Sequence, residues 1–336
     1  MTSSPTPAVP TERWRFVDSL RGFALFGVLL VNAIDIVHVG ITRALAGGAP
    51  VADPVRDALY LTVQTRFVPI FVFLFGMSLW FVLTGARARS GRPWLVMLRR
   101  LLTLAVIGGL LLVVYPGNIL LEYGIVGLLV LPVVLFAPRW LSLSLGVAMT
   151  VVAYGLLGGG LAATPGLMLL GAAAAAYGIP SRLEKAGKAV VVVFLAAVTV
   201  SVPALLWQLT QPGDPRFTLA GGIAGLVMAI AYLTGLALLW RTPAQRVIAA
   251  IFEPLGRMAL SNYTAAAIVF AGLAHVIDFA GMTSVLPVIL VSCALIGLQS
   301  VLSRMWLDRF AYGPVEWVWR MATWARPVRL RAEVAR

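Results

Sequence analysis

The sequence has very few residues of the kinds that build metal sites and soluble active sites. Its 336 residues include one cysteine, Cys293, and two histidines, His38 and His275. A single cysteine excludes an intrachain disulfide framework, and neither an HExxH nor a CxxC pattern occurs. A GxxxxGK[ST] phosphate-binding loop and a GxSxG nucleophile elbow are also absent. We therefore predict no bound metal and no active site of the soluble type.

Charge is also scarce, and apolar runs take its place. Charged residues make up 12% of the chain, hydrophobic residues make up 60%, and the mean hydropathy is +0.95. A soluble domain of this length cannot bury so much apolar surface, so the composition is that of a polytopic membrane protein. A membrane-spanning helix needs roughly 20 apolar residues. Runs of this kind predict an all-α bundle of about ten transmembrane helices, at 17–39, 59–84, 98–115, 119–136, 140–160, 164–179, 189–209, 218–240, 258–277 and 283–303.

Three segments follow from these runs: a disordered Pro/Ser/Thr-rich lead at 1–12, the helical bundle at 13–303 and a tail at 304–336. The tail interleaves tryptophan with arginine, which favours an amphipathic anchor on the cytoplasmic leaflet among membrane lipids. The alternative is that the basic residues of the tail, together with Arg21 and Arg257, receive an anionic cofactor or headgroup.

The basic residues give the chain a net charge of +13, and their placement indicates its orientation. Nearly all of them fall in segments that lie on one side if the N-terminus is cytoplasmic, and the exceptions are Arg43, Arg56, Arg66 and Arg216. Basic residues near helix ends are retained inside during insertion, so both termini are predicted to be cytoplasmic. Because no soluble basic domain is present, binding to nucleic acid is not expected.

The first predicted span contains an unusual set of polar residues. At 100° per residue, Asp18, Arg21, Asn32 and Asp35 share one face, whereas His38 lies about 100° from Arg21. The stripe from Asp18 to Asp35 runs for 17 residues, or about 26 Å. Charges inside a membrane are costly and normally face the interior or a wet cavity, so we interpret the stripe as lining a substrate path. For Asp18 and Arg21 alone, an ion pair at i, i+3 is the simpler alternative.

Further polar residues lie near the predicted outer face. Glu122 is at the start of the fourth span, and His38 and His275 each have an aspartate close by in sequence, Asp35 and Asp278. A general base needs to reach an acceptor proton with a suitable pKa. The candidate catalytic groups are therefore Asp35, His38, Glu122 and His275.

Glycine and alanine are concentrated in the fifth, sixth and eighth spans, for example in "GGGLAATPGLMLLGAAAAAYG" and "GGIAG". Small residues allow membrane helices to approach closely. These stretches predict tight helix packing.

Five stretches occur in an order typical of one family: "FVDSLRGFALFGVLLVNA", "TRFVPIFVFLFGMS", "GNILLEYGIVGLL", "GRMALSNY" and "YGPVEWVWRMATW". Over residues 13–330 the chain resembles the YeiB-like bacterial membrane proteins, whose C-terminal half is a domain of unknown function. That family is similar to transmembrane acyltransferases, including those that acetylate heparan glucosamine ends.

This resemblance implies a multi-pass protein of the bacterial cytoplasmic membrane that moves an acyl group from cytoplasmic acyl-CoA to an acceptor, often a sugar or a lipid-linked molecule. No permanently bound cofactor is implied, since acyl-CoA would be a co-substrate. The residues that match the family motifs and would bind the substrates are Asp18, Arg21, Asn32, Arg257, Asn262 and Glu316.

The chain departs from the family at three positions that are usually polar. Leu110 stands where a histidine is common, Asn118 replaces an aspartate, and Ala266 replaces a glutamine. Glu122, Asp35 and His38 are the groups that could replace the lost proton carriers. The residues therefore leave three functions open: an acyltransferase, a transporter of a small or lipid-linked metabolite, and a non-catalytic scaffold. They indicate no substrate, acceptor or oligomeric state.

Overall fold

The computed structural model describes residues 14–47 and 51–331, and all of its regular elements in that part are helices. The lead predicted at 1–12 lies outside the described residues. The α-helices are α1 (Arg15–Val37), α2 (Ile41–Leu45), α3 (Pro54–Thr62), α4 (Phe67–Arg89), α5 (Pro93–Leu111), α6 (Ile119–Phe136), α7 (Arg139–Leu157), α8 (Thr164–Ala176), α9 (Ile179–Lys185), α10 (Lys188–Leu209), α11 (Leu219–Leu239), α12 (Gln245–Arg257), α13 (Ala259–Leu273), α14 (Leu286–Leu307) and α15 (Pro314–Trp324), with 3-10 turns η1 (Gly160–Ala163) and η2 (Pro215–Phe217).

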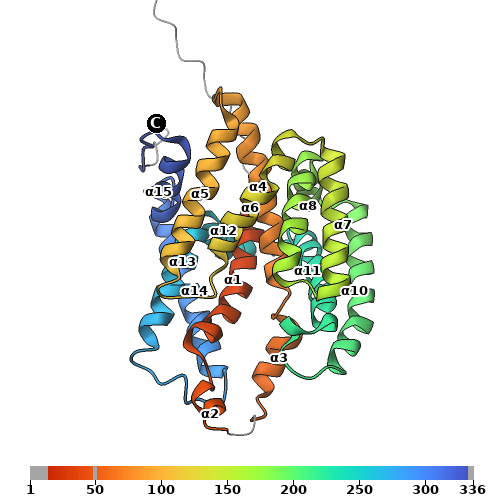
Figure 1. Ribbon diagram of the computed structural model, residues 1–336, viewed down its shortest axis with the longest axis vertical. Helices are drawn as coiled ribbons and strands as arrows, with labels where there is room; N and C mark the ends of the chain where they lie inside the picture. Colours follow the sequence, from red (N-terminus) through yellow and green to blue (C-terminus); the bar gives the residue numbers. More distant parts are fainter. Residues whose placement is uncertain (1–13, 48–50, 332–336) are drawn as a thin grey trace, which may run out of the picture.

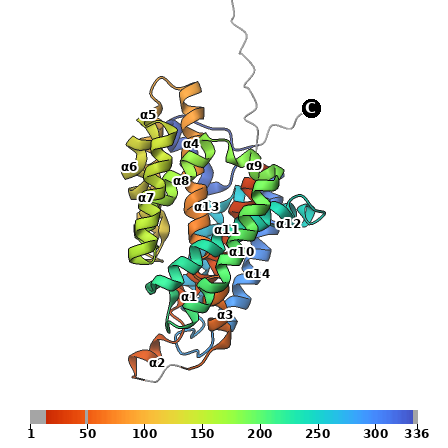
Figure 2. The same cartoon turned by 90° about the vertical axis from the view of Figure 1, so that its right-hand side faces the viewer.

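The helices form an elongated bundle (Figure 1). We call the end with α15 and the α4–α5 connection the upper end, and the end with α2 and α3 the lower end. From the side, α5, α6 and α7 lie on one flank and α12 and α14 on the other, with α4 between them (Figure 2).

Eight segments of the described chain are long and apolar enough to cross a membrane, which identifies a multi-pass membrane protein. Two further predicted spans match weaker candidates. The run at 164–179 corresponds to α8, which together with η1 forms a pair with α9 that is bent by 76°. The run at 258–277 corresponds to the shorter helix α13.

The exposed surface of the helices agrees with a lipid environment. In an apolar stretch of 18 residues in α1, 67% of the residues are buried inside the protein, whereas in the corresponding stretch of α10 only 22% are. The outer face of α10 exposes side chains such as Val192 and Leu206. Apolar surface of this extent on a soluble protein would cause aggregation, but it is the natural contact for acyl chains. Helix α1 is therefore central and α10 peripheral.

The predicted tight packing is confirmed where α4 meets α8. A Cβ atom added to Gly76 would lie 2.1 Å from the carbonyl oxygen of Met168, and one added to Gly171 would lie 2.0 Å from that of Phe73. Neither position can hold any other residue without moving a backbone. The glycines thus let the two helices touch along their main chains.

The span predicted at 59–84 is broken rather than continuous. It divides into α3 and α4 at residues 63–66, where Thr65 adopts a left-handed conformation (φ 69°). Such a conformation is uncommon for a residue with a branched Cβ. The break is held by bonds from Thr65 and Arg66 to neighbouring helices, described below.

The tail after α14 folds back onto the bundle. Helix α15 packs against α5 and α13, and the indole of Trp319 donates a 2.7 Å hydrogen bond to the carbonyl oxygen of Arg100 while its ring stacks on the Arg100 guanidinium at 3.7 Å. At least part of the tail therefore contacts protein.

Candidate functional site

A cavity of about 200 Å³ lies in the lower half of the bundle, between the end of α1 and the starts of α4 and α6. The wall of this cavity contains both polar and apolar residues. The polar residues that line it are Asn32, Asp35, Gln64, Thr65, Tyr115, Tyr154 and Arg216.

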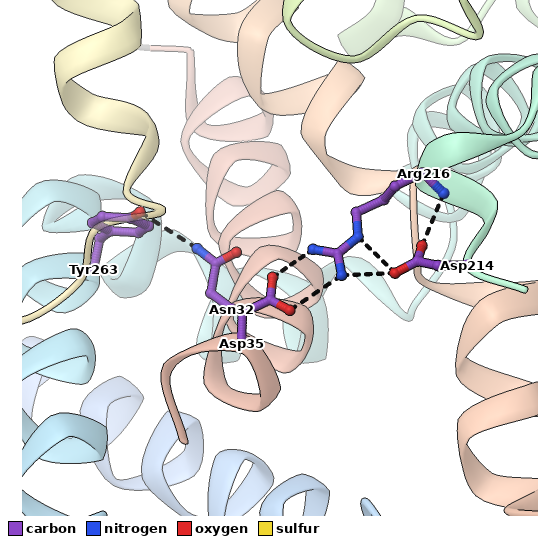
Figure 3. Close-up of polar contacts among 5 residues, drawn as sticks. All are labelled: Asn32, Asp35, Asp214, Arg216 and Tyr263. Atoms are coloured by element: carbon purple, nitrogen blue, oxygen red, sulfur yellow. Dashed lines mark hydrogen bonds and ion pairs between the residues drawn. The ribbon is translucent and has the colours of Figure 1, made fainter. Parts of the chain in front are cut away.

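One side of the cavity is formed by an ion-paired carboxylate (Figure 3). Arg216 donates to both carboxylate oxygens of Asp35, at 2.6 and 3.2 Å, and also to Asp214, at 2.7 and 2.9 Å. Burial lowers the pKa of Arg216, but its bonds to Asp214 and Asp35 outweigh this effect and raise the pKa above the usual value. Arg216 is therefore a permanent cation, and it holds the Asp35 side chain in place through two charge-assisted hydrogen bonds.

A neutral contact lies one turn earlier on α1. Asn32 Nδ2 donates to the Tyr263 hydroxyl at 3.4 Å, and the backbone N–H of Ile119 donates to the same oxygen at 3.3 Å. Figure 3 shows Asn32 and Asp35 projecting from neighbouring turns of α1, one toward Tyr263 and the other toward Arg216. Helix α1 therefore links α13 to η2 across the site.

The α3–α4 break supplies the next part of the wall, through Gln64 and Thr65. Arg66 is fully buried behind it and has no acidic partner within the described residues. Its guanidinium donates to Gln208 Oε1 at 2.5 Å, to the Gln64 carbonyl at 2.5 Å and to Thr65 Oγ1 at 2.8 Å. Thr65 Oγ1 in turn donates to the Gly221 carbonyl at 2.9 Å, so the break is tied to α10 and α11.

The polar stripe predicted on α1 is present, but its upper pair lies far from the cavity. Arg21 and Asp18 form the i, i+3 ion pair at 2.9 Å, and Arg21 also approaches the Gly256 carbonyl at 3.5 Å. Arg257 follows directly at the end of α12, so the structure places Arg21 and Arg257 on adjoining helix segments. About 21 Å of helix separates Arg21 from Asp35.

Asn262 and Glu316, predicted to bind substrate, make bonds within the protein. Glu316 Oε1 accepts from the backbone N–H groups of Leu260 (2.7 Å) and Ser261 (3.0 Å), and Oε2 accepts from the Ser261 hydroxyl. Burial raises the pKa of Glu316, and these donors oppose the rise. Glu316 thus caps the first turn of α13 and ties α15 to it, as a carboxylate at a helix N-terminus does.

Asn262 lies one turn into α13, where it is buried. Its Nδ2 donates to Ser303 Oγ at 3.0 Å, and its backbone carbonyl accepts from Gln299 Nε2 at 2.9 Å. These bonds join α13 to α14. Asn262 and Glu316 both lie at the upper end and not in the cavity wall.

Of the four candidate catalytic groups, Asp35 alone lines the cavity. Glu122 is one turn from the wall residue Ile119 and accepts a 2.6 Å bond from the Thr164 hydroxyl. The two histidines are exposed, and neither of them lines the cavity. His38 ends α1 in a left-handed conformation, and the His275 ring contacts the Ala271 carbonyl through Nδ1 at 2.8 Å.

The three departures from the family pattern have different surroundings. Leu110 is 71% exposed on α5 and faces away from the bundle interior, whereas Ala266 is buried in α13. Asn118 caps α6 by accepting from Leu120 N–H, and its Nδ2 donates to the carbonyls of Gly108 (3.1 Å) and Tyr115 (3.0 Å). Donation of this kind requires the amide, because an ionised carboxylate only accepts.

Sequence reasoning missed several residues of the wall. The wall residues Tyr115 and Tyr154 resemble ordinary apolar positions of spans, and no local pattern marks them. The same is true of Tyr263, which lies outside the wall but bonds to Asn32. The sequence marks Arg216 only by its charge, although Asp214, two residues earlier, indicates that the guanidinium has a partner.

A family model described as a protein of unknown function (DUF418) matches residues 174–326. An uncharacterized 39.9 kDa protein in the amylase 3' region of Bacillus acidopullulyticus is 32% identical, over 97% of this chain and 99% of that protein. The uncharacterized proteins YxaH of Bacillus subtilis and YeiB of Escherichia coli are 25% and 28% identical, over 99% and 93% of this chain and 100% and 96% of their own lengths. No solved structure matches the fold. The chain therefore belongs to the YeiB-like family of multi-pass membrane proteins, the function of which is unknown.

Proposed function

We propose that this protein is a membrane-embedded acyltransferase that moves an acyl group from cytoplasmic acyl-CoA to an acceptor at the far side of the membrane. The observation that carries the proposal is the cavity with Asp35 and Asn32 in its wall, on the same helix that presents Arg21 at the upper end. The family resemblance to transmembrane acyltransferases gives the reaction class.

The proposed orientation follows from charge. With both termini in the cytoplasm and ten spans, counting α8–α9 and α13, the upper end is cytoplasmic and the lower cavity opens toward the outside. The membrane is then the bacterial cytoplasmic membrane. Arg21 and Arg257 would contact the acyl-CoA, and the cavity would take the acceptor, a sugar or a lipid-linked molecule.

The chemistry assigns distinct roles to the cavity residues. An acceptor hydroxyl would donate its proton to the Asp35 carboxylate while its oxygen attacks the thioester carbonyl. The new C–O bond forms as the C–S bond breaks, and the CoA thiolate leaves and takes up a proton. Arg216 would fix the orientation of Asp35, and Asn32 would hold a second polar group of the acceptor. Because Arg21 and Asp35 are about 21 Å apart along α1, the two substrates would approach from opposite ends.

The test is binding of labelled acetyl-CoA to the purified full-length protein, wild type beside Arg21→Ala. We expect saturable binding by the wild type and a loss of at least tenfold in affinity in Arg21→Ala. Arg15→Ala is the matched control, because Arg15 is on the same helix but is 59% exposed and paired with Glu253. Unchanged binding by Arg21→Ala, or no binding by folded wild type at millimolar ligand, would reject the proposal.

A transporter is the second candidate, and one feature favours it. Between α7 and α8 the backbone departs from α-helical geometry at Gly158, Gly159 and Gly160, which all have positive φ, and Gly158 and Gly160 line the cavity. Unwound backbone beside a cavity is a common substrate site in transporters. Proteoliposomes that show solute flux without any acylated product would favour transport over acyl transfer.

A further inference from the structure

A second hollow, of about 410 Å³, lies at the upper end of the molecule. It is bounded by the end of α4, the connection at 90–92, the first two turns of α5, and the end of α15 with the segment that follows it. Four of its nine lining residues are arginines, and none that the structure describes is acidic. The arginines are Arg89, Arg92, Arg99 and Arg326.

Trp324 holds two of these arginines in place. The guanidinium of Arg89 lies 5.1 Å from the centre of the Trp324 ring, and that of Arg326 lies 5.5 Å from it. Stacking on an aromatic face restrains a guanidinium without using its N–H donors. Arg89 donates one hydrogen bond, from Nε to the Gly85 carbonyl oxygen at 3.1 Å. The other N–H donors of the Arg89 guanidinium, which has five in all, have no acceptor in the described part of the chain.

Ser90 adds a neutral group between the cations. Its Oγ accepts from the backbone N–H of Arg92 at 3.2 Å, which leaves the hydroxyl proton for a ligand oxygen. Guanidinium groups gathered around a hollow repel each other until an anion occupies it, and their planar forks match phosphate oxygens in pairs. Tryptophan beside arginine is also typical of the headgroup level of a membrane.

We propose that this hollow binds a phosphate group, either on the headgroup of an anionic phospholipid or on a soluble phosphate-bearing ligand. The site is separate from the lower cavity, since α4 runs for 17 residues, about 26 Å, from the wall residue Val72 to Arg89. It does not depend on acyl transfer, because any phosphate ester or anhydride of suitable size presents the same oxygens.

The test compares two double variants of the full-length protein in neutral detergent. Arg92→Gln with Arg99→Gln removes two charges from the hollow. Arg241→Gln with Arg246→Gln is the matched control, because it removes one charge from the α11–α12 connection and one from the first turn of α12, both outside the hollow. Inorganic pyrophosphate is titrated by calorimetry. Phosphatidylglycerol and phosphatidylcholine are compared by native mass spectrometry.

We expect the wild type to bind pyrophosphate saturably, or to retain phosphatidylglycerol over phosphatidylcholine. The hollow variant should lose at least tenfold in affinity, and the control should stay within twofold. Pyrophosphate binding identifies a soluble ligand, and lipid retention without it identifies a headgroup; either result supports the site. No binding of either probe by folded wild type, or equal losses of affinity in both double variants, overturns the proposal. The arginines then serve only to orient the chain in the membrane.

Folding is checked by the elution profile and by the melting temperature of each variant. If the double variant does not fold, the exposed single change Arg92→Gln serves in its place, with a loss of at least threefold expected. A failure here leaves acetyl-CoA binding by Arg21 untouched, since neither Arg92 nor Arg99 contacts Arg21 or the cavity.

Discussion

The buried guanidinium of Arg66 fixes the broken span that forms part of the cavity wall. It is 0% exposed and is satisfied by neutral acceptors, the nearest side chain being that of Gln208 at 2.5 Å. Gln208 is also buried, and its Nε2 donates to the Tyr60 carbonyl at 3.1 Å. Gln208 therefore bridges α10 to both halves of the break, and its replacement should destabilise the wall.

The change Gln208→Met keeps the length of the side chain and removes both hydrogen bonds. A hydrogen bond to a charged group contributes about 1.5–3 kcal/mol and a neutral one about 1 kcal/mol, so the expected loss in the free energy of unfolding is about 3 kcal/mol. With an unfolding entropy of about 2.1 cal/mol/K per residue over 336 residues, this loss lowers Tm by about 4 °C.

Thermal unfolding in detergent, followed by intrinsic tryptophan fluorescence, measures the change. Gln211→Met is the control, since Gln211 lies three residues further on and its side chain has no hydrogen bond within the described chain; its Tm should change by less than about 1 °C. The double variant Arg66→Met/Gln208→Met removes the cation together with its acceptor. It should lose less stability than the sum of the two single variants. A Gln208→Met protein with the Tm of the wild type, or strictly additive losses, would refute this account of the break.

Two further predictions concern helix packing and the tail. Gly171→Ala places a methyl group against the Phe73 carbonyl and should lower the free energy of unfolding by about 1–3 kcal/mol. The control is Gly155→Ala, where an added Cβ meets nothing within 4 Å, and it should be nearly neutral in the same melting assay. Glu316→Ala removes the acceptor of two N–H groups at the start of α13 and should cost about 1 kcal/mol, as the loss of a helix cap does. Trypsin should then cleave after Arg320 faster than in the wild type, and the cleavage rate of Glu316→Gln should lie between those of Glu316→Ala and the wild type. Equal cleavage rates in all three proteins would show that the cap does not hold α15.

The helical class and most helix positions could be predicted because a bilayer imposes a simple rule on length and polarity. The fourth predicted span, 119–136, coincides with α6. The rule fails where side chains satisfy the backbone inside the bundle, as at Thr65 and Arg66, because an apolar run there looks continuous. It also fails for α12, an amphipathic helix that hydropathy does not detect.

The candidate site was only partly accessible from the sequence. Helical periodicity placed Asn32 and Asp35 on an interior face, and both line the cavity. Periodicity within one helix cannot give the partners, because Tyr263 and Arg216 come from segments that lie more than 180 residues away in the chain. It also grouped Asp18 with Asp35 by angle, although the two lie at opposite ends of α1 and have separate surroundings.

The unused bonding capacity of the interior polar groups separates structural residues from those that can meet a ligand. Arg66, Asn118 and Glu316 direct their donors or acceptors to the protein itself, and their role is to join helices. Asn32 is different: its Nδ2 bonds to Tyr263, and its Oδ1 accepts nothing from the described residues. Asp35 accepts two bonds from Arg216, fewer than its two oxygens can take. Polar groups cost several kcal/mol in a membrane unless they are satisfied, so the spare acceptors of Asn32 and Asp35 require water or a polar ligand in the cavity. Hydroxyl and amine groups are the donors that would complete both, which is the chemistry of an acyl acceptor.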